Sequence, residues 1–134
     1  MNQYYILLLI AVILVLACIY VYYKSTSNKI EKFETNSIVV RLFYVDWCGF
    51  CKTTKPEFIK FMNKYNNKTV NNKKISIQMI NCEENAENAQ LAEEMKVESY
   101  PTIIAEINGK EYTFKNERNE NAFIKWTNHL CKST

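Results

Sequence analysis

The sequence lacks charge at its start, because no Asp, Glu, Lys or Arg side chain occurs before Lys24. A cleaved signal peptide usually begins with basic residues and has an apolar core of about 7–15 residues. Here residues 4–23 form one run of twenty apolar or aromatic side chains. As a helix this run is about 30 Å long, which matches the hydrocarbon core of a bilayer. We predict a transmembrane helix over residues 4–23 that contacts the lipid bilayer, and a cleaved signal peptide is the disfavoured alternative.

The sequence also lacks a large surplus of charge of one sign. It has 17 Lys and Arg against 14 Asp and Glu, and the two signs are interspersed. A nucleic-acid-binding domain usually carries a basic patch or stripe, so we expect no nucleic-acid partner. Residues 24–36 are polar and are predicted to form a linker. Residues 37–134 are then left for one domain with a core of its own.

The charges beside the apolar run bear on location. Lys24, Lys29 and Lys32 follow the run and nothing basic precedes it, so the positive-inside rule weakly favours a cytosolic domain. We expect a single-pass membrane protein with an N-terminal anchor. The Asn-rich composition suggests a large DNA virus as a source, in which case the location would be a host membrane or the virion. The sequence predicts no particular oligomeric state.

Periodicity divides the rest of the chain into alternating strands and helices. An apolar run over residues 37–45 is typical of a strand covered on both faces, and a helical period starts at Gly49. Further strands are predicted over 74–80, 102–107 and 110–114, and further helices over 84–96 and 119–130, with a tight turn at Asn108–Gly109. The order β-α-β-α-β-β-α predicts an α/β fold with a central mixed sheet and helices on both faces.

Several side chains within these elements carry specific expectations. Phe58, Ile59, Met62 and Tyr65 are predicted to form the buried stripe of the first of these helices, which Pro56 should kink. A second stripe is predicted at Ala89, Leu91, Ala92 and Met95. Arg41 interrupts the first strand, so its charged group must reach a polar partner or an edge.

The stretch VDWCGFCK places Cys48 and Cys51 at the junction of a strand and a helix. A helix N-terminus has unpaired N–H groups and a partial positive charge. These groups favour a thiolate and lower the pKa of Cys48. Cys51, one turn further on, is shielded by the helix body. An exposed, easily ionised thiol beside a buried one is the arrangement that disulfide exchange requires, so the pair is predicted to be redox-active.

Two other uses of the cysteine pair are disfavoured. A structural zinc site needs four ligands, and only Cys82, His129 and Cys131 remain as candidates, with no second CxxC, so no metal is predicted. A purely structural disulfide would close too small a ring to stabilise the fold appreciably. Cys82 is instead predicted to be buried and inert. Cys131, near the end of the chain, is predicted to be exposed, where it could pair between chains.

A second segment supports the redox interpretation. The sequence SYPT, residues 99–102, comes directly before a predicted strand. If the peptide bond before Pro101 is cis, neighbouring backbone groups are free to pair with an extended peptide, and cis bonds are almost confined to proline. The alternative is a trans proline at the start of an edge strand.

Taken together, these segments resemble the thioredoxin-like family, and in particular its protein disulfide isomerase-type domains. FYVDWCGFCKTTKP resembles the active-site strand, cysteine motif and helix-kinking proline of that family. QLAEEMKVESYPTI resembles the segment that leads into its cis-proline loop, and INGKEYTF its terminal hairpin. The resemblance covers about residues 37–130. It implies a thioredoxin-like fold, here preceded by a single transmembrane helix.

The resemblance also implies roles for individual residues. Cys48 would be the nucleophile and Cys51 the resolving thiol, and the two would form a redox-active disulfide that needs no other cofactor. Trp47, Tyr100 and Pro101 would bind the substrate. The implied partners are protein thiols and disulfides, and the implied activity is that of a membrane-anchored thiol–disulfide oxidoreductase.

The chain departs from the family pattern at three places. A buried acid usually lies six residues before the first cysteine, and here that residue is Leu42. Phe50 precedes Cys51 where family members have proline or histidine, and the first strand and helix of the family are absent or vestigial. Arg118 matches an arginine that can swing toward the active site, although a solvated loop charge is equally consistent. Because of Leu42, the alternative function is a non-catalytic thioredoxin-fold module that binds partners or scaffolds a membrane assembly.

Overall fold

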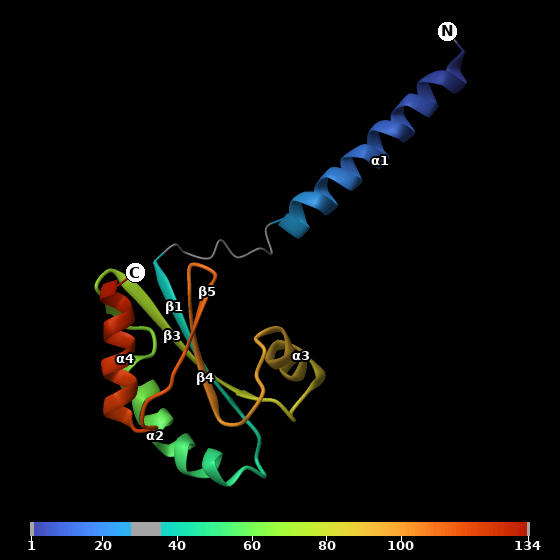
Figure 1. The fold of residues 1–134 in the computed structure, drawn as a ribbon. Helices are drawn as coiled ribbons and strands as arrows, with labels where there is room; N and C mark the ends of the chain where they lie inside the picture. The colour runs from blue at the N-terminus through green and yellow to red at the C-terminus, as the bar shows by residue number, and fades with distance from the viewer. Residues whose placement is uncertain (1, 28–35, 134) are drawn as a thin grey trace. The chain divides into compact units, whose positions relative to one another are not determined.

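The apolar N-terminal run forms one long helix, α1 (Gln3–Ser27), in the computed structural model, which describes residues 2–27 and 36–133 (Figure 1). Leu, Ile, Val and Ala fill this segment without Gly or Pro, so nothing in it interrupts a helix. Residues Gln3–Val21 are long and apolar enough to cross a membrane, and none of this stretch is buried by protein. The helix continues to Ser27, so the first residues of the predicted linker are helical. Residues 28–35 of that linker lie outside the described residues.

The second compact unit, residues 34–134, contains the predicted α/β domain. Its elements are β1 (Ser37–Tyr44), α2 (Gly49–Tyr65), β2 (Thr69–Val70), β3 (Lys73–Asn81), α3 (Ala86–Glu94), β4 (Thr102–Ile107), β5 (Lys110–Thr113) and α4 (Glu120–Ser133). The sheet order is β2-β3-β1-β4-β5. Strand β1 pairs parallel with β3 and antiparallel with β4. The predicted fold class is therefore confirmed.

The short strand β2 was not predicted. It pairs antiparallel with the start of β3, and the two are joined at Asn71 and Asn72, which both have positive φ. Asparagine tolerates this conformation better than most residues, so the Asn pair was the available signal for a hairpin. The predicted turn at Asn108–Gly109 is present, with φ of 51° and 74°.

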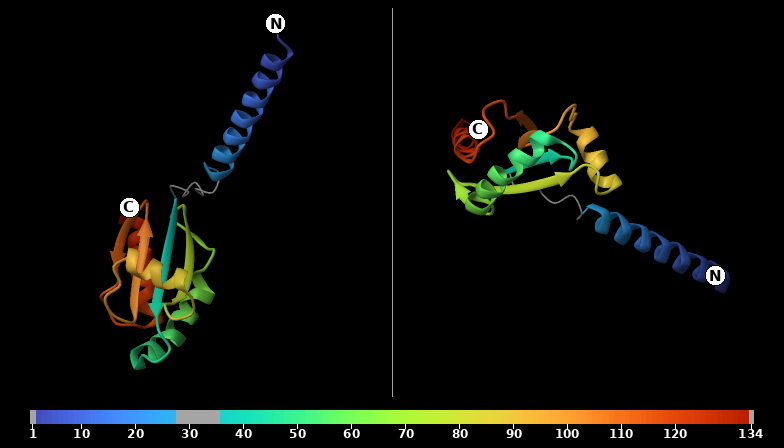
Figure 2. Two further views of the ribbon diagram at one scale, coloured as in Figure 1. Left: turned by 90° about the vertical axis from the view of Figure 1, so that its right-hand side faces the viewer. Right: turned by 90° about the horizontal axis from the view of Figure 1, so that it is seen from below.

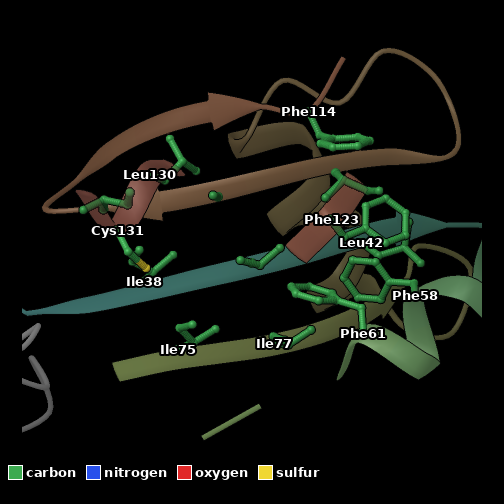
Figure 3. Close-up of a cluster of buried hydrophobic side chains, with 14 residues drawn as sticks. Ile38, Leu42, Phe58, Phe61, Ile75, Ile77, Phe114, Phe123, Leu130 and Cys131 are labelled. Atoms are coloured by element: carbon green, nitrogen blue, oxygen red, sulfur yellow. The ribbon is translucent and has the colours of Figure 1, made fainter. Parts of the chain in front are cut away.

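Helices α2 and α4 cover one face of the sheet and α3 covers the other (Figure 2). The larger core lies under α2 and α4, where Leu42 of β1 packs among Phe58, Phe61 and Phe123 (Figure 3). These aromatic rings contact one another at centroid distances of 5.5–5.8 Å. Phe43, the next residue of β1, packs in the second core, under α3. Because β1 is covered on both faces, its sequence is apolar apart from Ser37 at its start and Arg41.

The predicted stripe of α2 was wrong at one position. Ile59 is 39 % exposed, whereas Phe61 is fully buried. The buried side of the helix follows Cys51, Thr54, Phe58 and Phe61, a spacing of three or four residues that places them on one face. In α3 the prediction was likewise wrong at Ala89, which is exposed, while Ala92 and Met95 are buried.

Arg41 finds its polar partners across the sheet, as its position in an apolar strand required. Its guanidinium ion-pairs with Glu106 of β4 at 2.6 Å and donates a hydrogen bond to Gln78 of β3 at 3.1 Å. The expectation of an exposed Cys131 was wrong. Cys131 is buried in the larger core, because the amphipathic α4 turns this residue toward the sheet, and the ammonium of Lys73 donates to its carbonyl at 3.2 Å.

Candidate active site

Cys48 lies where two loops of the domain meet. It is the N-cap of α2, and its sulfur accepts a hydrogen bond from the N–H of Cys51 at 3.3 Å. Its thiol also donates to the carbonyl of Tyr100, 3.4 Å away, in the loop before β4. The thiol is less exposed than predicted, because these contacts turn it inward and leave the residue only 7 % exposed. The sheet register thus brings the cysteine motif against the proline loop.

The two thiols of the pair differ in how easily they ionise. The hydrogen bond from the thiol of Cys51 lowers the pKa of Cys48 below its usual range; burial opposes this shift, and the backbone N–H groups of Cys51 and Phe50 and the charge of Arg118 reinforce it. Cys51 is fully buried, and burial followed by its contact with Cys48 raises the pKa of Cys51 to about 11. Disulfide exchange uses this kind of difference, since the thiolate is the attacking species.

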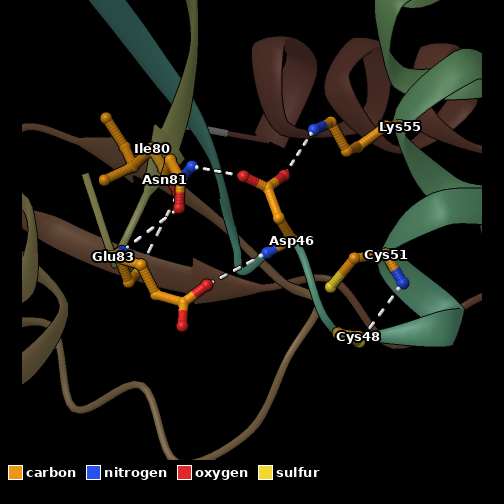
Figure 4. Close-up of polar contacts among 8 residues, drawn as sticks. Asp46, Cys48, Cys51, Lys55, Ile80, Asn81 and Glu83 are labelled. Atoms are coloured by element: carbon orange, nitrogen blue, oxygen red, sulfur yellow. Dashed lines mark hydrogen bonds and ion pairs between the residues drawn. The ribbon is translucent and has the colours of Figure 1, made fainter.

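A polar group of three side chains, two of them charged, lies beside the pair (Figure 4). The carboxylate of Asp46 accepts from the ammonium of Lys55 at 3.1 Å and from the amide of Asn81 at 2.9 Å. These two bonds lower the pKa of Asp46. The ammonium of Lys55 also lies 4.0 Å from the centroid of the Tyr44 ring, a cation–π contact. None of these residues was predicted to belong to the site.

Two aromatic rings flank the cysteines on the surface. Trp47 and Phe50 are each 71 % exposed. The indole N–H of Trp47 donates to one oxygen of Glu83 at 2.9 Å, and the other oxygen accepts the backbone N–H of Asp46 at 3.2 Å. The carboxylate therefore fixes the indole beside Cys48 while the ring stays open to solvent. Glu83 was also missed, because its role depends on a contact across 36 residues of sequence.

The proline loop has the cis geometry that the sequence left open. The peptide bond between Tyr100 and Pro101 is cis, and Pro101 is buried. The hydroxyl of Tyr100 hydrogen-bonds with the thiol of Cys82, and burial followed by this contact raises the pKa of Tyr100. Cys82 is buried, as predicted, and burial raises the pKa of its thiol.

Arg118 and Leu42 occupy contrasting surroundings. Arg118 is exposed in the segment before α4, and its charge favours the thiolate of Cys48. Leu42 is fully buried and faces Met79 on β3 and Ile103 on β4, so its surroundings in the sheet are apolar. Over residues 2–27 and 36–133, no three His, Cys, Asp or Glu side chains are grouped as metal ligands would be.

Comparison with known proteins identifies the family of this domain. The family model described as Thioredoxin matches residues 19–129. The thioredoxin of Mycoplasma pneumoniae is 33% identical over 88 residues, which cover 66% of this chain and 76% of that protein. Protein disulfide-isomerase A5 of Bos taurus is 27% identical over 106 residues, or 79% of this chain and 19% of that protein.

Solved structures agree in fold. The first thioredoxin domain of mouse Protein disulfide-isomerase A4 superposes with a TM-score of 0.60 at 22% sequence identity, covering 81% of this chain and 71% of that chain. The first two thioredoxin domains of Saccharomyces cerevisiae Eps1p give a TM-score of 0.62 at 20% identity, covering 74% and 37%. The chain spans less than a fifth of the length of several disulfide isomerases that it matches, at 15%, 19% and 12%. The match of the family model over most of the sequence, together with the fold, shows that this chain belongs to the thioredoxin family.

Proposed function

We propose that the protein is a membrane-anchored thiol–disulfide oxidoreductase that exchanges disulfides with protein substrates through Cys48 and Cys51. The opposite pKa shifts of the two thiols carry the proposal: the pKa of Cys48 is lowered and that of Cys51 is raised to about 11. Such a pair ionises one sulfur at a time. The cysteine pair itself carries the two electrons, so the proposal requires no further cofactor.

The exchange proceeds in two steps. The Cys48 thiolate attacks a substrate disulfide, a mixed disulfide forms, and one substrate thiolate leaves and takes up a proton. Cys51 then gives its proton to water and attacks the sulfur of Cys48. The bond between Cys48 and the substrate breaks, the second substrate thiolate leaves, and the Cys48–Cys51 disulfide remains. Two electrons have passed to the substrate, and the reverse sequence oxidises a dithiol. The direction follows the potential of the surrounding thiol pool.

The surface around Cys48 supports a protein substrate. Trp47 and Phe50 offer two open aromatic rings, and such rings supply apolar contact area at interfaces. The loop at Tyr100 and Pro101 lies against the Cys48 sulfur, so a chain carrying the attacked disulfide would touch both segments. Similarity to protein disulfide isomerases supports the same substrate class.

The first test of this proposal is the reactivity of the two thiols. We expect Cys48 to alkylate at least about tenfold faster than Cys51 at pH 7, because the thiolate is the reactive form. As the pH is raised, the alkylation rate of Cys48 should level off at a lower pH than for an ordinary thiol, and the alkylation rate of Cys51 should level off at a higher pH. Timed alkylation followed by peptide mass spectrometry measures both. Comparable rates at the two positions would contradict the proposed asymmetry.

The apolar helix α1 supports anchoring, with residues 4–23 in the bilayer, 24–36 as linker and 37–134 as the domain. We expect the full chain to stay with membranes after alkaline carbonate extraction, whereas a chain without residues 2–23 should be released. Protease digestion of sealed vesicles then reports on which side of the membrane the domain lies. The lysines after the span favour the cytosolic side. Extraction of the full chain by carbonate would rule out the anchor.

The buried Leu42 favours a second candidate, a non-catalytic module that binds partners or scaffolds a membrane assembly. A buried acid at this position would accept the proton of the resolving thiol, and leucine cannot do so. This candidate predicts that the full chain binds partner proteins equally well after Cys48→Ser and that it turns over no disulfide. Reduction of a model protein disulfide by the full chain in detergent separates the two functions.

A further inference from the structure

Lys55 holds a fixed positive charge one helical turn after Cys51. Residues four apart on a helix lie on the same side, and Figure 4 shows Lys55 above the Cys51 thiol on α2. The ammonium is held at 3.1 Å by Asp46, which is itself fixed by Asn81, and by the ring of Tyr44. The Lys55 side chain is 29% exposed. A charge so held is only partly screened by water, so it acts on the adjacent thiol.

Cys51 needs such a charge during the second step of exchange. Its thiol is fully buried, and burial disfavours the thiolate. The Cys48 thiol also opposes ionisation of Cys51, whereas the charge of Lys55 favours it. In the mixed disulfide the Cys48 sulfur is bonded to substrate and carries no negative charge. The opposing influence of Cys48 is then gone and that of Lys55 remains.

We propose that Lys55 is a positioning residue for this step, whose fixed ammonium stabilises the Cys51 thiolate while that sulfur attacks Cys48. The inference rests on the proposed function. Cys51 gives its proton to water, the sulfur–sulfur bond forms between the two cysteines, the bond from Cys48 to substrate breaks, and the departing thiolate takes up a proton from water. Lys55 keeps its own proton. Partial burial is the largest single influence and lowers its pKa, but the hydrogen bond to Asp46 and the interactions with Tyr44 and the Asp46 charge together outweigh it, so the pKa of Lys55 is raised.

The other titratable groups near the pair are engaged elsewhere. They come from the end of β1, the start of α2, the end of β3, the loop before β4 and the segment before α4, and comprise Tyr44, Asp46, Cys48, Lys52, Cys82, Glu83, Tyr100 and Arg118. Arg118 acts on Cys48, and Glu83 holds the indole of Trp47. Lys52 acts on Asp46. Lys55 is thus the cation whose position suits the resolving thiol.

The test is a stopped-flow reaction of the full chain in detergent with excess aryl disulfide that releases a coloured thiolate. Cys18, Cys82 and Cys131 are first replaced by alanine, so that two coloured equivalents report the pair. The first phase measures attack by Cys48 and the second measures resolution by Cys51. Lys55→Met should keep the rate of the first phase within about twofold of the parent rate. It should slow the second phase about five- to tenfold at pH 7, because loss of the charge lowers the fraction of Cys51 that is thiolate. In this variant the rate of the second phase should also level off at a higher pH than in the parent chain.

Matched variants separate the charge from the fold. Lys55→Arg keeps the cation and should restore most of the second phase. Lys60→Met removes a lysine of the same helix that pairs with Glu57 instead, and should change neither phase. An unchanged first phase shows that each variant is folded. If Lys55→Met resolves as fast as the parent chain with the same pH profile, the inference is wrong. If the parent chain shows no first phase, the proposed function itself fails.

Discussion

Serine at position 48 is expected to abolish disulfide exchange, and serine at position 51 is expected to trap the substrate. The Cys48 sulfur attacks first, because its pKa is lowered by the hydrogen bond from the Cys51 thiol, whereas burial raises the pKa of Cys51 to about 11. Cys48→Ser therefore leaves only a buried, protonated thiol, and turnover should fall by about a thousandfold or more, the loss typical of removing a nucleophile. Cys51→Ser keeps the first step and removes the second, so a mixed disulfide should accumulate.

Reduction of a model protein disulfide by the full chain, followed by non-reducing gels, measures both outcomes. The matched control is Cys82→Ser, because Cys82 lies in the same buried cluster as the pair but makes no step of the proposed reaction. It should retain turnover. Equal turnover by the parent chain and Cys48→Ser would end the enzyme proposal, and unimpaired partner binding would then favour the scaffold function. A mixed disulfide that forms through Cys51 in place of Cys48 would reverse the assigned roles.

Leu42→Glu is expected to have the largest effect on stability and to speed the second step of exchange. Leu42 is fully buried between Met79 and Ile103, so an introduced carboxyl loses its water without gaining a partner. An unpaired buried charge costs about 3–5 kcal/mol. The family pattern implies that an acid at this position accepts the proton of the resolving thiol, so in the protein that still folds the second phase of the aryl disulfide reaction should be faster.

The stability loss should depend on pH with a defined sign. Burial raises the pKa of the introduced carboxyl above its unfolded value of about 4.3. Below that value both states hold the proton and the loss is smallest. As the pH rises toward the folded pKa, only the unfolded state releases the proton, so the free energy of unfolding falls further. Denaturant unfolding between pH 4 and 8 measures this trend.

Leu42→Gln is the control for the acid, because it buries a similar polar side chain that does not ionise. Its loss of unfolding free energy relative to the parent chain should be large but independent of pH, and the rate of its second phase should match that of the parent chain. If the rate of the second phase is unchanged in folded Leu42→Glu, the missing acid does not limit the attack of Cys51 on Cys48. The same result is expected if the charge of Lys55 already stabilises the Cys51 thiolate enough.

Local patterns in the sequence determined most of the elements. Strand β4 was predicted with its observed bounds, and the hairpin at Asn108–Gly109 has the two positive φ angles that such a turn needs. The predicted buried stripe of α2 was wrong at Ile59. Several apolar residues of this helix fit one face by spacing alone, and only packing against the sheet decides which of them are buried. The prediction that Cys131 is exposed failed for a similar reason. Proximity to the chain end does not predict exposure when the amphipathic helix α4 packs on the sheet and buries that residue.

The sequence by itself determined that the first cysteine of the pair lies at the start of a helix after a buried strand, and that an apolar helix precedes the domain. Strand period, helix period and capping depend on neighbours along the chain, so they can be read from it. Only the tertiary structure decided which side chains surround the pair. Glu83 reaches Trp47, Asn81 reaches Asp46 and Tyr100 reaches Cys48 because β1 lies between β3 and β4 in one register. Such contacts join residues that are 35 or more positions apart, and no local pattern encodes them.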